Sequence, residues 1–266
     1  MTTFETDGFL SADIVGAERA IAARYQRKLE LATETNRLTH RVIYSVKPHS
    51  EHVTELLLAA LLTRQAAAFQ AFLILLGKGL ETQAQIILRN LAEMMFITGA
   101  IGKDKTFADK YVLSEEVSRL KTLEAIAKDQ QCRGERVDGD TTRLIEELRA
   151  QTKGKRPETF TAARMAEIAG LSSYYDNLYR LTSMAVHASP RELNTAFVVD
   201  GEGNLVSMRY EPVVDDLDLY LDYAISVMLY SLHEMATHFG LGLVGDIEKV
   251  QQINQQLAGP GGQAGS

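Results

Sequence analysis

The residues best suited to chemistry lie in one segment, residues 173–191. Within it, Asp176, Arg180, Ser183 and His187 follow one another at intervals of four, three and four residues. Residues three, four or seven positions apart share a face of an α-helix, so these side chains would form one polar stripe. A guanidinium, a hydroxyl and an imidazole over two turns can bind a phosphate and transfer a proton near neutral pH.

The same spacing also suits a structural role. Asp176 and Arg180 would form an ion pair on a solvated face, and His187 would meet the last carbonyl groups of the helix. The opposite side of the helix, which includes Leu178 and Tyr179, would face the core. Spacing alone favours this structural interpretation.

A second charged pair, Arg89 and Glu93, is spaced i, i+4 on the most apolar predicted helix. Charges in such a helix are costly unless they are paired, so we expect the two side chains to meet. One interpretation is a polar pocket in the bundle, shared with Arg180 and His187. The other is an ion pair that only fixes the register of the helix.

Helices must position these residues, and the composition favours helices. Hydrophobic residues make up 45% of the 266 residues, and only 5 residues are proline, so little interrupts a helical pattern. We predict an all-α multi-helix bundle with one small inserted β-hairpin at about 195–210. The predicted helices cover approximately residues 11–44, 51–76, 81–101, 105–128, 141–150, 161–169, 173–186, 214–239 and 246–257.

The organisation predicted along the chain is simple. Residues 1–257 are expected to form a single helical domain, and residues 258–266 a disordered Gly-rich tail. The most apolar stretch, residues 56–76, is interrupted by Arg64, Gln65 and Gln70. We therefore expect a central bundle helix there and no membrane span.

Charge and cysteine content narrow the functional classes. The net charge is -7, from 28 basic and 35 acidic residues, so no broad DNA-binding surface is expected. The single cysteine, Cys132, allows no disulfide within the chain, and with the polar start of the sequence this predicts a cytoplasmic protein.

No metal or other cofactor is predicted from the sequence. His233 and His238 are five residues apart and cannot share a ligand face. His49 and His52 are three apart, but they stand at a predicted helix start, where polar residues are common.

The interval from Arg180 to His187 resembles the motif of the HEPN superfamily of helical nucleotide-binding domains. In that superfamily, an Arg and a His on one helix of a bundle cleave RNA without metal, at a site built by two copies. The resemblance implies that His187 is the general base or acid at a ribose 2′-hydroxyl and that Arg180 stabilises the phosphate charge. Ser183 would be an accessory hydrogen-bonding group. Leu181 stands where many of those ribonucleases have a polar residue.

A second resemblance is to a family of bacterial proteins of unknown function. It rests on the segment 87–93, which contains Arg89 and Glu93, and on the segment 179–189. The resemblance covers approximately residues 50–240 and implies no particular activity.

The sequence therefore leads to two functional hypotheses. The first is a HEPN-like, metal-independent ribonuclease, a toxin or phage-defence effector that works as a homodimer on RNA. Its catalytic residues would be Arg180, His187 and Ser183. The alternative is a non-catalytic helical module that binds a nucleotide or a partner protein through the region of Arg89, Glu93, Arg180 and His187. Arg89, Glu93, Asp176 and Tyr179 would be its binding residues, because hydroxyl and aromatic groups suit ligand orientation.

Overall fold

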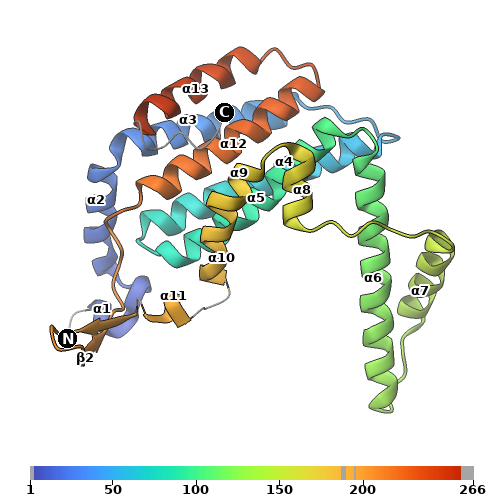
Figure 1. Cartoon of the computed structure of the whole chain (residues 1–266), viewed down its shortest axis with the longest axis horizontal. Helices are drawn as coiled ribbons and strands as arrows, with labels where there is room; N and C mark the ends of the chain where they lie inside the picture. The colour runs from blue at the N-terminus through green and yellow to red at the C-terminus, as the bar shows by residue number, and fades with distance from the viewer. Residues whose placement is uncertain (1–2, 187–189, 195, 259–266) are drawn as a thin grey trace.

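The computed structural model describes residues 3–186, 190–194 and 196–258, which form a helical bundle with one short hairpin (Figure 1). This confirms the predicted fold class. The first half of the chain holds the helices α1 (Thr3–Asp7), α2 (Val15–Arg24), α3 (Gln26–Ser45), α4 (Val53–Gly77), α5 (Glu81–Lys103) and α6 (Phe107–Cys132). The second half holds the helices α7 (Gly139–Thr152), α8 (Ala162–Ala169), α9 (Ser172–Tyr174), α10 (Arg180–Val186), α11 (Pro190–Asn194), α12 (Asp218–His238) and α13 (Val244–Ala258).

Helix α5 forms the centre of the bundle. Every residue from Met94 to Ile101 is buried, which is the expected burial of a helix that is apolar on most sides. The helix packs against α4, α8, α10 and α12. Each fully buried Leu or Phe side chain contributes about 1.5–3 kcal/mol to the burial free energy, so α5 anchors the fold.

Two of the neighbours of α5 approach it closely at Gly99. A Cβ atom there would lie 2.8 Å from the hydroxyl oxygen of Tyr230 in α12 and 2.9 Å from the Cβ of Ala169 in α8. Because both distances are shorter than van der Waals contact, the small residue is needed for this packing.

Helix α4 is long and apolar enough to cross a bilayer by length and composition alone. In the structure it packs against α3, α5 and α12, and Leu58, Leu62, Phe69 and Phe72 are among its buried residues. It therefore covers one side of the core, whereas the prediction placed it at the centre, and the absence of a membrane span stays a prediction. The helix ends at Gly77, and the left-handed Gly79 (φ 73°) two residues later turns the chain away, with its backbone N–H donating to the carbonyl of Leu76 at 2.9 Å.

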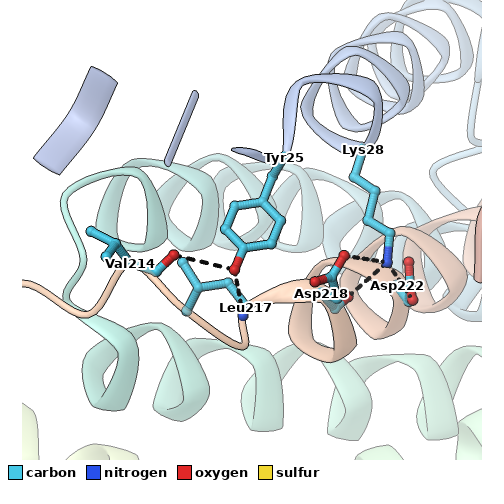
Figure 2. A network of polar contacts seen from close by, with 6 residues as sticks. All are labelled: Tyr25, Lys28, Val214, Leu217, Asp218 and Asp222. Carbon is cyan, nitrogen blue, oxygen red and sulfur yellow. Dashed lines mark hydrogen bonds and ion pairs between the residues drawn. The ribbon is translucent and has the colours of Figure 1, made fainter. Parts of the chain in front are cut away.

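The prediction of one continuous helix over residues 11–44 was wrong. Ser11 does accept a hydrogen bond from the backbone N–H of Asp13, but it caps a short 3-10 turn, and the chain breaks again at Tyr25 (φ -108°, ψ 21°). Tyr25 is 3% exposed, and its hydroxyl lies 3.2 Å from both the carbonyl of Val214 and the backbone N–H of Leu217 (Figure 2). A contact with the far end of the chain thus accompanies the break between α2 and α3.

Helices α6 and α7 stand away from the other helices as an antiparallel arm (Figure 1). Phe107 and Ala108, at the start of α6, are buried, and α7 packs against α6 with Ile145 and Leu148 buried. The arm therefore has a small apolar interface of its own.

The predicted hairpin consists of β1 (Phe197–Val199) and β2 (Leu205–Met208), which pair antiparallel with Phe197 opposite Met208. It lies beside α1 (Figure 1), and the ring of Tyr210, just after β2, packs on Phe9 at 5.5 Å between centroids. Pro190 is the first residue of α11, a position that suits proline because the first helical N–H has no partner inside the helix. The tail was predicted at residues 258–266. Ala258 is the last residue of α13, and residues 259–266 lie outside the described residues.

Candidate functional site at the face of α5 and α10

Arg89 and Glu93 form the ion pair that their spacing predicts. The Nη2 atom of Arg89 lies 3.3 Å from Oε1 of Glu93, and the two side chains are 21% and 33% exposed. Their neighbours Leu88, Leu91 and Ala92 are fully buried, so the pair lies at the border between core and solvent. At such a border the attraction between charges is screened less than on an open surface.

The side chain of Tyr179 joins the pair from the neighbouring helical segment. Its hydroxyl donates to Oε1 of Glu93 at 2.7 Å and accepts a hydrogen bond from Nη2 of Arg89. The guanidinium carbon of Arg89 also lies 4.5 Å from the centre of the Tyr179 ring, the distance of a cation–π contact. One tyrosine therefore holds both charged side chains in place.

Burial is the main reason why the pKa of Tyr179 rises to about 12, and the hydrogen bond to Glu93 and the negative charge of that residue add to it. The positive charge of Arg89 acts in the opposite direction. The phenol is therefore protonated at neutral pH, and its proton points to a carboxylate.

An aromatic wall flanks this cluster. Tyr175 and Tyr179 lie at the two ends of a π-helical turn, η3 (Tyr175–Tyr179), and their rings stack at 5.2 Å between centroids. Phe96 of α5 lies 6.1 Å from the Tyr179 ring. Single π-helical turns inside helices are frequent at functional sites, which makes this segment a candidate on backbone grounds as well.

The negative charge of Glu93 also affects Tyr111 of α6, which no pattern in the sequence marks as a site residue. Burial raises the pKa of Tyr111, and the negative charges of Glu115 and Glu93 raise it further. Tyr111 therefore lies within electrostatic reach of Glu93. No spacing in the sequence connects the two residues, because only the packing of α6 against the bundle brings them together.

Arg180 and Asp176 form the predicted ion pair, with 3.4 Å between Nη1 and Oδ1. Both side chains are largely exposed, at 69% and 60%, so this contact contributes little to stability. The hydroxyl of Ser183 donates to the carbonyl of Tyr179 at 2.6 Å, and the residue is half-buried. His187 lies outside the described residues, so the complete polar stripe stays a prediction.

The side chain of Arg89 also carries one buried donor atom. The Nε atom of Arg89 is buried and has no hydrogen-bond partner among the described residues. A buried donor left unpaired costs about 1–3 kcal/mol, and such atoms in native proteins often meet a ligand or an ordered water. The Arg89 side chain as a whole is 21% exposed, and a guanidinium held over an aromatic ring suits an anion such as a phosphate.

Comparison with known proteins gives a family for the chain. Residues 55–205 match the family of unknown function DUF5677, which is more than half of the chain, and the protein belongs to this family. The matched region runs from the first turn of α4 to the start of β2 and contains both Arg89 and Tyr179. No curated protein and no solved structure matches the chain. The predicted resemblance to a family of unknown function is thereby confirmed.

Proposed function

We propose that the protein binds a phosphate-bearing ligand, a nucleotide or RNA, at the face that α5 and α10 share. The observation that carries this proposal is the half-buried guanidinium of Arg89, which Tyr179 and Glu93 hold in a fixed position and which is 21% exposed. Arg180 provides a second, exposed guanidinium on the helix that continues from Tyr179. Arginine binds phosphate through two parallel N–H donors.

A second candidate is a HEPN-like, metal-independent ribonuclease that acts as a homodimer, as a toxin or defence effector in the cytoplasm. The exposure of Arg180 favours it, because a site built by two copies needs its arginine on the surface. In this function Arg180 stabilises the phosphate charge, Ser183 assists, and His187 transfers the proton at the ribose 2′-hydroxyl.

Calorimetric titration with ATP and with single-stranded RNA, in EDTA, tests the binding proposal. We expect Arg89→Lys and Arg180→Ala to weaken binding at least about tenfold, because lysine lacks the planar fork of arginine and alanine lacks any charge. Arg143→Ala is the matched control, since Arg143 is 70% exposed and pairs with Asp140, as Arg180 pairs with Asp176. Absence of binding by the unchanged protein, or equal affinity in all variants, would contradict the proposal.

The same RNA, examined on a gel, separates binding from catalysis. Cleavage in EDTA that is lost in both His187→Ala and Arg180→Ala would establish the ribonuclease. Binding without cleavage would leave the protein a binding module. Cleavage that survives in both variants would place the activity elsewhere or in a contaminant.

A further inference from the structure

Three side chains with metal-binding atoms gather where the loop after α3 enters α4. They are His49, His52 and Glu55, and their candidate ligand atoms all lie within 4.8 Å of one another. The Nδ1 atom of His49 lies 2.8 Å from Oε2 of Glu55, and Nδ1 of His52 lies 2.8 Å from Oε1 of the same carboxylate. One carboxylate thus faces two imidazole rings.

The local backbone fixes this arrangement. The backbone N–H of His52 donates to the carbonyl of His49 at 3.0 Å and closes a turn, and that of Leu56 donates to the carbonyl of His52 at 3.0 Å. The backbone N–H of His49 also donates to Oε2 of Glu55 at 2.8 Å. A turn followed directly by the first helical turn therefore brings residues at intervals of three to one side.

We propose that His49, His52 and Glu55 bind a divalent cation of the zinc class. Imidazole nitrogens with a carboxylate oxygen are the ligands that zinc takes in proteins, and three protein ligands leave a position for water. A magnesium or calcium ion would instead require a set made mostly of oxygen atoms. The site shares no residue with the α5 and α10 face, so it stands independently of the function proposed there.

The geometry requires only a small adjustment. Tetrahedral zinc with bonds of about 2.0–2.2 Å keeps its ligand atoms roughly 3.3–3.5 Å apart. The two histidine side chains are 72% and 60% exposed and free to turn by this amount, whereas Glu55, at 16% exposed, is held by the helix. The alternative is that the histidines only hydrogen-bond the carboxylate at the start of α4, with no ion involved.

Titration of the metal-stripped, full-length protein with zinc chloride, followed by calorimetry, distinguishes a zinc site from histidines that only hydrogen-bond Glu55. We expect one zinc per chain, and an affinity at least about tenfold weaker in each of His49→Ala, His52→Ala and Glu55→Gln. Cobalt as a spectroscopic probe should give the absorption of a nitrogen- and oxygen-bound ion, and each variant should lose it. Circular dichroism shows whether the variants are folded, and the histidine changes lie on the surface.

Two control variants keep the test specific. His238→Ala removes an exposed histidine from the last turn of α12, and Glu51→Gln removes an exposed carboxylate beside the site. Neither change should alter zinc affinity. The proposal is overturned if the unchanged protein takes up no zinc, or if the three ligand variants bind it as tightly as these controls.

Discussion

At the scale of single residues, the hydroxyl of Tyr179 organises the candidate site. It donates to Glu93 and accepts from Arg89, two residues of another helix, so three side chains behave as one unit. A hydrogen bond to a charged partner contributes about 1.5–3 kcal/mol, more than one between neutral groups. Tyr179 is also only 8% exposed, so if its hydroxyl were removed, water could not readily take over the hydrogen bonds to Glu93 and Arg89.

Replacing Tyr179 with phenylalanine should lower the free energy of unfolding by about 1–2 kcal/mol at neutral pH, because the bridging hydroxyl is lost while the ring remains. Urea unfolding measures this change. Tyr44→Phe is the control. Tyr44 is 83% exposed, so this change should lower the free energy of unfolding only slightly.

The raised pKa of Tyr179 makes the stability of the folded protein depend on pH. Its pKa is about 12 in the folded protein, against about 10 for tyrosine in an unfolded chain, so the folded state holds its proton more tightly. The resulting stability is full below about pH 10 and is lost as the pH rises towards 12. Tyr179→Phe should lack this part of the alkaline decline, and an identical decline in both proteins would contradict the assignment.

At the scale of elements, close packing around α5 holds the site's helix in place. Gly99 lets α8 and α12 approach, and the next turn carries Gly102, whose missing side chain leaves room for the carboxylate of Glu234. Both glycines lower the intrinsic helix propensity of α5 by about 1 kcal/mol each relative to alanine. Tight packing of neighbouring helices offsets this cost.

Gly99→Ala should therefore destabilise the protein by about 1–2 kcal/mol, since the added Cβ would overlap with Tyr230 and Ala169. Gly77→Ala is the matched control, because a Cβ at Gly77 in α4 meets no described atom within 4 Å. That change should be neutral or stabilising by up to about 1 kcal/mol. Thermal or urea unfolding of the two variants would reveal the difference, and equal effects would argue against close approach at Gly99.

At the scale of the whole molecule, Lys28 connects α3, near the start of the chain, with α12, near its end. Its ammonium group lies 2.9 Å from Asp218 and 2.8 Å from Asp222, both in α12 (Figure 2). The side chains of Lys28 and Asp222 are only 12% and 17% exposed. Burial is the largest influence on the pKa of Asp222 and raises it, whereas the ammonium group of Lys28 opposes this rise.

Lys28→Met should cost about 2 kcal/mol of unfolding free energy, because it leaves a half-buried carboxylate without its partner. Arg24→Met removes a neighbouring contact of the same kind, but the ion pair of Arg24 and Asp215 is 55% and 61% exposed. We expect the second change to have a small effect. Equal losses in both variants, measured by urea unfolding, would refute the role given to Lys28.

Much of the fold could be predicted from the sequence because apolar periodicity and helix-stop residues act locally. The ends of α4 and α5 lie within about two residues of the predicted positions, since the loop at Gly79 ends one helix in any packing. The pairing of Arg89 with Glu93 was predictable for the same reason, since one helical turn separates the two residues.

Other features could not be predicted, because they depend on partners far away in the sequence. The break at Tyr25 coincides with hydrogen bonds to Val214 and Leu217, which no local pattern reveals. The pair of His49 and His52 was visible, but its connection to Glu55 depends on how the chain turns into α4.

The sequence by itself determined most of the elements of this protein, including its hairpin and the residues that share a helical face, but not the break at Tyr25. Those properties follow from backbone hydrogen bonding and from side-chain spacing within about two turns. The tertiary structure decided which faces meet, and so joined Tyr179 to Arg89 and Glu93 from a separate helix. The physical reason is that burial and close packing are properties of surfaces in contact, and a linear pattern specifies a surface without specifying its partner.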